Sequence, residues 1–102
     1  MATLLDDATL MQELAGLDGW VVLTAADRPV LSKDFTFSDF PAAMDFVNRV
    51  AVIAEDEFHH PDITISYNTV GLQITSHEDG GITDKCVTVA SRIDKLGETE
   101  DT

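Results

Sequence analysis

The chain has 102 residues, a single cysteine, and nineteen acidic against six basic residues, which gives a formal net charge of -13. Its length predicts one domain with a modest core, and its charge disfavours direct binding of DNA or RNA, whose phosphates it would repel. One cysteine excludes an internal disulfide and fits a reducing cytoplasm, and the lack of a run of about 20 apolar residues argues against a membrane span.

The first predicted elements are a helix and a β-hairpin. Asp6 and Asp7 suit the start of a helix, and Gly19 is a plausible stop. The apolar residues at helical spacing between them are Leu10, Met11, Leu14 and Leu17. The stretches "WVVLT" from residue 20 and "VLSKDFTF" to residue 37 are β-branched and aromatic, and the turn-like "ADRP" between them predicts a hairpin.

The next predicted element is an amphipathic helix that begins at Ser38 or Asp39, since either side chain can cap it. Its apolar residues form a wide stripe with period 3.6. They are Phe40, Ala43, Met44, Val47, Val50, Ala51 and Ala54. The sequence "HHP" at residues 59–61 is expected to end this helix, because proline cannot continue it.

A second hairpin is predicted after the proline, where the apolar positions change to period two over residues 63–67 and 70–74. A two-residue turn at residues 68–69 would pair residues whose numbers add to 137. The apolar pairs in this register are Ile63 with Ile74, Ile65 with Leu72, and Tyr67 with Val70. On the polar side, His60 falls opposite His77 if the pairing continues that far.

The last predicted element is an amphipathic helix that follows the loop "HEDGG" and that Thr83 can cap. Its apolar residues are Cys86, Val87, Ala90, Ile93 and Leu96. Residues 1–97 are therefore expected to form the single domain, and the acidic residues 98–102 a frayed tail.

The candidate functional residues are the three histidines, which the second hairpin brings to one end of the sheet. Imidazole has an ordinary pKa of about 6.5, so His59, His60 and His77 around a polar pocket would suit general acid and base catalysis. Pro61 would act as a rigid mount, because it biases His60 toward an extended backbone. The alternative for each histidine alone is structural: a cation that complements the end of a helix, or a surface loop residue.

Two other kinds of site are disfavoured. The histidines with Asp62, Glu78, Asp79 or Cys86 could supply enough ligands for a metal, but adjacent histidines point in divergent directions and no metal-binding motif is present. Nucleophilic catalysis by Cys86 is disfavoured as well, because a lone cysteine at an apolar helical position is usually a small buried hydrophobe.

Several motifs together resemble a pterin-4a-carbinolamine dehydratase, over residues 19–96. They are "GW" at residues 19–20, "FTF" at 35–37, "AEDEFHHPD" from 54, "TSH" at 75–77 and "GGIT" at 80–83. The central motif has an acidic residue, three further positions, His-His-Pro, then an aromatic residue and a third histidine. It is met by Glu55, His59, His60, Pro61, Tyr67 and His77.

The resemblance implies an α+β fold, a four-stranded antiparallel sheet with three helices packed on one face, in the order α-β-β-α-β-β-α. It also implies assembly into homodimers or homotetramers. The implied reaction is the loss of water from a 4a-hydroxytetrahydropterin to give the quinonoid dihydropterin, which supports tetrahydrobiopterin recycling and needs no metal or organic cofactor.

By this resemblance, the catalytic residues are His59, His60 and His77. His60 and His77 are expected to transfer protons, while His59 positions the departing hydroxyl and Glu55 orients His59. The other residues expected to contact or support the pterin are Pro61, Ser76, Glu78, Asp79 and Cys86.

Two positions depart from the family pattern. Cys86 stands where family members commonly have an aspartate, and Ile63 stands where they often have a tryptophan. The first departure removes an acidic group from the expected site. A second hypothesis is therefore a noncatalytic member of the fold, such as a transcription-factor dimerisation partner or an assembly chaperone. The presence of all three histidines favours the enzyme.

Overall fold

The computed structural model describes residues 3–25 and 27–100, the last four of these by backbone only. Its elements are α1 (Asp7–Ala15), β1 (Val21–Ala25), β2 (Arg28–Thr36), α2 (Phe40–Glu57), β3 (Asp62–Ser66), β4 (Thr69–Ile74) and α3 (Asp84–Glu100). The predicted α+β class and element order are confirmed. None of the described helices is both long enough and apolar enough to cross a membrane.

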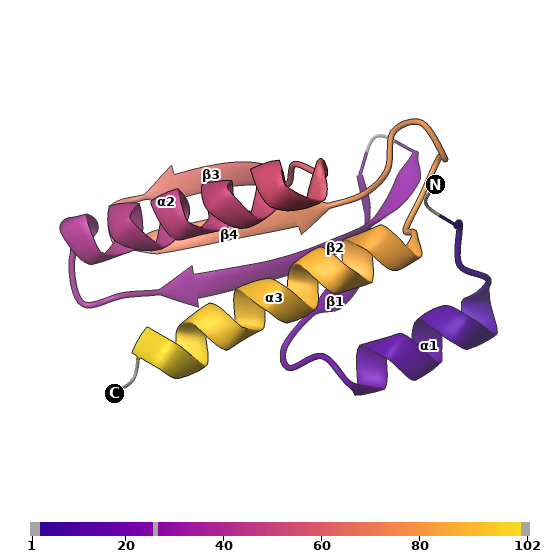
Figure 1. The fold of residues 1–102 in the computed structure, drawn as a ribbon, viewed down its shortest axis with the longest axis horizontal. Coiled ribbons are helices and arrows are strands. Elements are labelled where there is room, and N and C mark those ends of the chain that lie inside the picture. The colour runs from indigo at the N-terminus through magenta and orange to yellow at the C-terminus, as the bar shows by residue number, and fades with distance from the viewer. Residues whose placement is uncertain (1–2, 26, 101–102) are drawn as a thin grey trace.

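The four strands form one antiparallel sheet in the order β1-β2-β4-β3, so the two hairpins meet through β2 and β4. Figure 1 shows α2 and α3 together across one face of this sheet, with α1 on the side of α3 away from α2. Because neighbouring residues of a strand point to opposite faces, Leu31 of β2 and its partner Ile74 of β4 both point toward the helices. The sheet therefore has one helix-covered face.

The core lies between that face of the sheet and the two long helices. Its members come from every layer and are almost fully shielded from solvent. They are Trp20, Leu31, Ala43, Phe46, Val50, Ile53, Val70, Leu72, Ile74, Ile82, Cys86, Val89, Ala90 and Ile93. The period of 3.6 in α2 and α3 and the period of two in β4 place most of their apolar residues on this side. The stripe predicted for α2 is wrong at Phe40 and Ala51, which are exposed, and it does not include Phe46 and Ile53, which are buried.

The register of the second hairpin differs from the predicted one by two residues. Ile63 pairs with Leu72 and Ser66 with Thr69, so the turn consists of residues 67–68. Asn68 explains the shift, since its side-chain amide donates to the carbonyl of Phe37 at 2.9 Å and ties the turn to the end of β2. A shift of two keeps the side chains that remain in the strands on their predicted faces, but it moves Tyr67, predicted to pair with Val70, into the turn, where it is exposed. The predicted pairing of His60 with His77 is wrong, however, because the ladder ends at residues 62 and 73.

Helix α1 is shorter than its apolar pattern predicts. Asp6 caps it by accepting the N–H of Thr9 at 2.8 Å, and this hydrogen bond lowers the pKa of the Asp6 carboxyl. The helix ends at Ala15, with Gly16 as its C-cap, so Leu17 lies beyond it. Met11 is not a core residue, because 70% of its surface is exposed. The three leucines that do pack against the core are Leu10, Leu14 and Leu17.

The amino-terminal residues 3–5 hold the start of α3. Leu4 forms a β-bridge with Thr83, and the N–H of Leu5 donates to the carbonyl of Ile82 at 3.0 Å. Thr3 and Asp84 exchange two hydrogen bonds, one through the Asp84 carboxylate at 2.8 Å and one between backbones at 3.0 Å. The amino-terminal segment is thus joined to the first turn of α3.

Helix α3 continues to Glu100, beyond the last predicted apolar position at Leu96. It therefore includes part of the segment 98–102 for which a frayed tail is predicted. Residues 101–102 of that segment lie outside the described residues.

One lysine lies on the helix-covered face of the sheet, where an acidic partner from α3 meets it. The ammonium of Lys33 is 3.0 Å from the Asp94 carboxylate, which also accepts the indole N–H of Trp20 at 2.9 Å. We expect Asp94→Ala to lower the free energy of unfolding by about 2 kcal/mol, because both donors would remain partly buried without this acceptor. Urea unfolding measures this change.

The matched control for Asp94→Ala is Asp45→Ala, which removes a carboxylate that pairs with Arg49 across one turn of α2 at 3.1 Å. That pair is largely exposed, so its loss should cost less than about 1 kcal/mol. Equal losses from the two variants would contradict the role given to Asp94.

Candidate functional site

The three histidines line one pocket at the end of the sheet, where α2 ends and α3 begins. The pocket has a volume of about 570 Å³. Its lining residues are Glu57, Phe58, His59, His60, Thr75, Ser76, His77, Glu78, Asp79 and Lys85. Two short segments supply nearly all of them, residues 57–60 after α2 and residues 75–79 after β4. The histidines predicted to converge are therefore brought together.

The end of α2 sets the direction in which the paired histidines leave the helix. Phe58 adopts a left-handed backbone with φ 52° and ψ 41°. The N–H of His59 then donates back to the carbonyl of Ala54 at 3.0 Å, which closes the last turn. Pro61 follows in the extended segment that enters β3, and it is not among the residues that line the pocket.

His59 is the most enclosed of the three imidazoles. It is half-buried, and its Nε2 lies 3.2 Å from the Sγ of Cys86. Burial lowers the pKa of His59 below its ordinary 6.5, and the positive charge of Lys85 lowers it further. The negative charge of Asp79 and a hydrogen bond to the Thr75 backbone act in the opposite direction but do not reverse the shift. His59 is therefore held as a neutral ring near pH 7.

Cys86 is fully buried in the first turn of α3, and its Sγ closes that turn. The Thr83 N–H donates to this sulfur at 3.4 Å, and the Cys86 N–H donates to the Thr83 hydroxyl at 3.4 Å. This reciprocal arrangement is that of a capping box, with a thiol in place of the usual carboxylate or amide. Burial raises the pKa of the Cys86 thiol, so His59 faces a neutral group.

The lowered pKa of His59 predicts how the stability of the protein depends on pH. Because the folded-state pKa of His59 lies below 6.5, the unfolded chain binds a proton first. The stability contributed by neutral His59 is therefore complete above about pH 6.5 and is lost as the pH falls through the folded-state value. Cys86→Asp would place a carboxylate beside the ring, so we expect the pKa of His59 to rise by about one unit or more. NMR titration of the His59 ring measures this directly.

The control for this titration is Cys86→Ser, which removes the sulfur without adding charge and should titrate close to the wild type. Urea unfolding at about pH 5 and pH 7 gives a second readout, since the loss of stability at the lower pH should shrink in Cys86→Asp. An unchanged His59 midpoint in Cys86→Asp would contradict this account of the site.

His60 is exposed, and its partner is Glu55. The Nε2 of His60 lies 2.5 Å from the Glu55 Oε2, and both side chains are more than half open to solvent. The prediction that Glu55 orients His59 is therefore wrong. The backbone reverses at Phe58, so the second histidine of the pair, rather than the first, returns to the carboxylate one turn back on α2.

His77 is held by an arginine from the start of β2. The Nη1 of Arg28 lies 3.2 Å from the His77 Nδ1 and 3.1 Å from the His77 carbonyl oxygen. Guanidinium can only donate, so Nδ1 must accept and the neutral ring carries its proton on Nε2. Arg28 was not predicted as a site residue, because a basic residue in a turn-like "ADRP" gives no signal of a partner 49 positions away.

The loop that carries His77 is closed on itself. The backbone N–H of Ser76 donates to the Gly81 carbonyl at 2.8 Å, and the Ser76 hydroxyl donates to the Asp79 carboxylate at 2.6 Å. Glu78 and Asp79, which are expected to contact the pterin, line the pocket, and Ser76 lines it while also donating to Asp79. The loop therefore contributes two acidic residues to the lining of the pocket.

Four lining residues were not predicted as members of the site: Glu57, Phe58, Thr75 and Lys85. The Lys85 ammonium lies 3.7 Å from Glu57, and Arg92 contacts both Glu57 and Asp56 at 2.7 Å. These contacts join α2 to α3 behind the pocket. The signal that could have identified the four residues is their position in the sequence. Glu57 and Phe58 directly precede the "HHP" motif, Thr75 begins "TSH", and Lys85 follows Thr83 by two positions.

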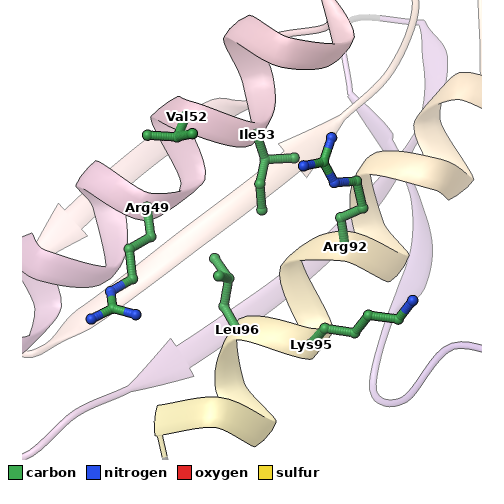
Figure 2. Close-up of a pocket in the computed structure, with 6 residues that line it drawn as sticks. All are labelled: Arg49, Val52, Ile53, Arg92, Lys95 and Leu96. Carbon is green, nitrogen blue, oxygen red and sulfur yellow. The ribbon is translucent and has the colours of Figure 1, made fainter.

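A second pocket of about 450 Å³ lies between α2 and α3 (Figure 2). It is lined by Arg49, Val52, Ile53, Arg92, Lys95 and Leu96. Ile53 and Leu96 point toward each other between the helices, whereas Lys95 extends away from α2. Its lining includes no histidine and no carboxylate. Among residues 3–25 and 27–100, no cluster of histidine, cysteine and acidic side chains is arranged to hold a metal ion.

Comparison with known proteins identifies the family of the chain. Residues 3–96 match the family model described as pterin 4 alpha carbinolamine dehydratase. A relative from Thermomicrobium roseum, named "Putative pterin-4-alpha-carbinolamine dehydratase", is 45% identical over 92 residues, which are 90% of this chain and 95% of that protein. A relative of the same name from Sulfurisphaera tokodaii is 41% identical over 92 residues, again 90% and 95% of the two chains.

Two solved structures share the fold. The transcriptional coactivator/pterin dehydratase from Brucella melitensis superposes with a TM-score of 0.83 at 28% identity and covers 92% of this chain and 98% of its own. A pterin dehydratase-like RuBisCO assembly factor of the α-carboxysome superposes with a TM-score of 0.63 at 23% identity, over 76% and 88% of the two chains. The second likeness speaks for the fold alone. From the family match and these relatives, the chain belongs to the pterin 4 alpha carbinolamine dehydratase family.

Proposed function

We propose that this protein dehydrates a 4a-hydroxytetrahydropterin to the quinonoid dihydropterin and water. In this reaction the bond between C4a and the hydroxyl oxygen breaks, N5 loses its proton, and a double bond forms between C4a and N5. The departing hydroxyl takes up one proton and leaves as water. The observation that carries the proposal is that all three imidazoles line one pocket.

His60 takes the proton from N5, and His77 hydrogen-bonds the departing hydroxyl. Glu55 accepts from the Nε2 side of His60, which leaves Nδ1 of the neutral ring to take the proton from N5, and the carboxylate stabilises the imidazolium that results. His77 donates a hydrogen bond from its Nε2–H to the departing hydroxyl, because Arg28 occupies its Nδ1. The hydroxyl takes its proton from solvent, since a neutral imidazole is too weak an acid to give up its one ring proton, and His60 then returns the proton from N5 to solvent.

His59 positions the departing hydroxyl as a neutral hydrogen-bonding group. Burial and Lys85 keep this ring uncharged, so it does not compete with His60 for the proton from N5. The carboxylates of Glu78 and Asp79, and the buried Ser76, supply polar groups for the amide and amine edges of the pterin. Because proton transfer accounts for the whole reaction, the proposal requires no metal or organic cofactor.

The biological setting is proposed on the same basis. The substrate class implies a role in tetrahydrobiopterin recycling in the cytoplasm, and the net charge of -13 argues against direct binding of nucleic acid. Strands β1 and β3 are the edges of the sheet, and Leu23 and Ile65 on them are exposed. Such edges favour pairing with a second copy, so we propose a homodimer or homotetramer.

The experiment that tests the proposed function mixes the purified protein with a 4a-hydroxytetrahydropterin generated in situ and follows the quinonoid product by absorbance. The expected result is a rate well above that of the spontaneous dehydration, in proportion to the protein concentration. A rate no higher than the spontaneous one would reject catalysis and favour the alternative hypothesis, that the protein is a noncatalytic binding module.

A further inference from the structure

We propose that Phe58 is a substrate-contacting residue whose phenyl ring packs against the flat face of the bicyclic pterin at the mouth of the histidine pocket. This inference rests on the proposed function and adds to it the group that would hold the ring system.

The first observation is the composition of the pocket. Of its ten lining residues, nine are histidines or carry hydroxyl, carboxylate or ammonium groups, and Phe58 is the one apolar side chain. Polar groups can satisfy the edges of a heteroaromatic ring, but its faces need apolar or aromatic surface to be removed from water favourably. Within this lining, Phe58 alone offers a hydrocarbon ring for that purpose.

The second observation is that Phe58 is almost fully exposed, at 88% of its surface, although it is a large hydrophobe. Its ring contributes almost nothing to the core, because little of it is shielded. An exposed apolar ring beside a polar pocket is a surface that a ligand can cover.

The third observation is the backbone at this position. Phe58 has φ 52°, a conformation that glycine and asparagine adopt easily and that is unfavourable for a bulky side chain. The helix end needs a left-handed residue here, but it does not need a phenylalanine. Strain of this kind at a ligand pocket is consistent with a side chain kept for binding.

Tyr67 provides a matched control within the same chain. It also has φ 52° and is 66% exposed, but it lies in the turn between β3 and β4 and does not line the pocket. Phe58→Gly and Tyr67→Gly therefore relieve the same backbone strain and remove a similar exposed ring. Only the first of them removes a ring from the proposed site.

The experiment measures three properties of the wild type, Phe58→Gly, Phe58→Tyr and Tyr67→Gly. Isothermal titration calorimetry gives the Kd for biopterin, an unreactive planar pterin, the turnover assay gives KM and kcat, and calorimetry gives Tm. We expect Phe58→Gly to weaken biopterin binding and raise KM by roughly tenfold, as loss of one stacked aromatic contact implies. Tyr67→Gly should stay within about twofold, and Phe58→Tyr should bind like the wild type because it keeps the ring.

Both glycine variants should raise Tm, since each removes a left-handed non-glycine residue. A purely structural role for Phe58 would not produce higher stability together with weaker binding.

Equal Kd and KM in Phe58→Gly and the wild type would overturn the inference while leaving the proposed function intact. A change of sedimenting mass in Phe58→Gly with unchanged binding would also overturn it, by assigning the ring to an interface between copies. Failure of the wild type both to bind biopterin and to exceed the spontaneous rate would reject the proposed function as well.

Discussion

Replacing His77 with alanine is expected to reduce kcat for the dehydration by about a hundredfold or more, which is the usual cost of losing a hydrogen-bond donor to a group that gains negative charge in the transition state. The ring that Arg28 holds at 3.2 Å is the proposed hydrogen-bond donor to the departing hydroxyl, and alanine cannot donate. His60→Ala should cause a loss of similar size, because it removes the proposed acceptor for the N5 proton. Absorbance of the quinonoid product, corrected for the spontaneous reaction, measures both losses.

The design of this test includes the double variant and a distant control. Since the two histidines act on one transition state, His60→Ala with His77→Ala should be little worse than either single variant. Met11→Ala, on the exposed side of α1, should retain the wild-type rate. Wild-type kcat in either single histidine variant would reject the assigned roles, provided that its circular dichroism and Tm show a folded protein.

Replacing Phe46 with alanine is expected to lower the free energy of unfolding by about 3–5 kcal/mol, the range for removal of a buried aromatic side chain. Phe46 projects from α2 into the core, with 1% of its surface exposed. Its ring centre lies 4.7 Å from that of Phe35 and 4.9 Å from that of Phe37, so alanine would leave a cavity and remove two aromatic contacts. A domain of this size has a total stability of roughly 5–15 kcal/mol, so much of it would be lost.

Urea unfolding of Phe46→Ala, compared with Phe40→Ala, measures this effect. Phe40 lies on the same helix but is 46% exposed, so its replacement should cost less than about 1 kcal/mol. A loss below about 1.5 kcal/mol for Phe46→Ala would mean that the core closes around the missing ring, contrary to the packing described here.

Elements with a long and regular apolar pattern were predicted well. The apolar stripe in α2 and the alternation in β4 each indicate which side of the element is buried. The register error of two residues in the second hairpin did not change that side, because side chains in a strand repeat every two residues. Met11 fits the spacing of α1 yet is exposed, because a short helix at the edge of the core buries only a narrow face. The apolar pattern therefore predicted the buried faces of the central elements better than that of the short helix at the edge of the core.

The site was predicted in part, for a physical reason. Its residues come from two short segments, and the sequence near "HHP" and "TSH" indicated where those segments would meet. The partners of the histidines were not predicted, because they depend on local backbone geometry and on contacts between distant elements. Because the backbone is left-handed at Phe58, His60 contacts Glu55 and His59 does not. Arg28 contacts His77 from the start of β2, which is distant in the sequence.

The hydrogen bonds that join residues 3–5 to the first turn of α3 connect the beginning of the chain to the wall of the pocket. These hydrogen bonds hold Thr83 and Asp84, which lie next to Lys85 and Cys86 in the sequence. Lys85 lowers the pKa of His59, and Cys86 contacts its ring. Natural variation or a fusion partner at the amino terminus could therefore tune the electrostatics of the pocket without touching any residue that lines it.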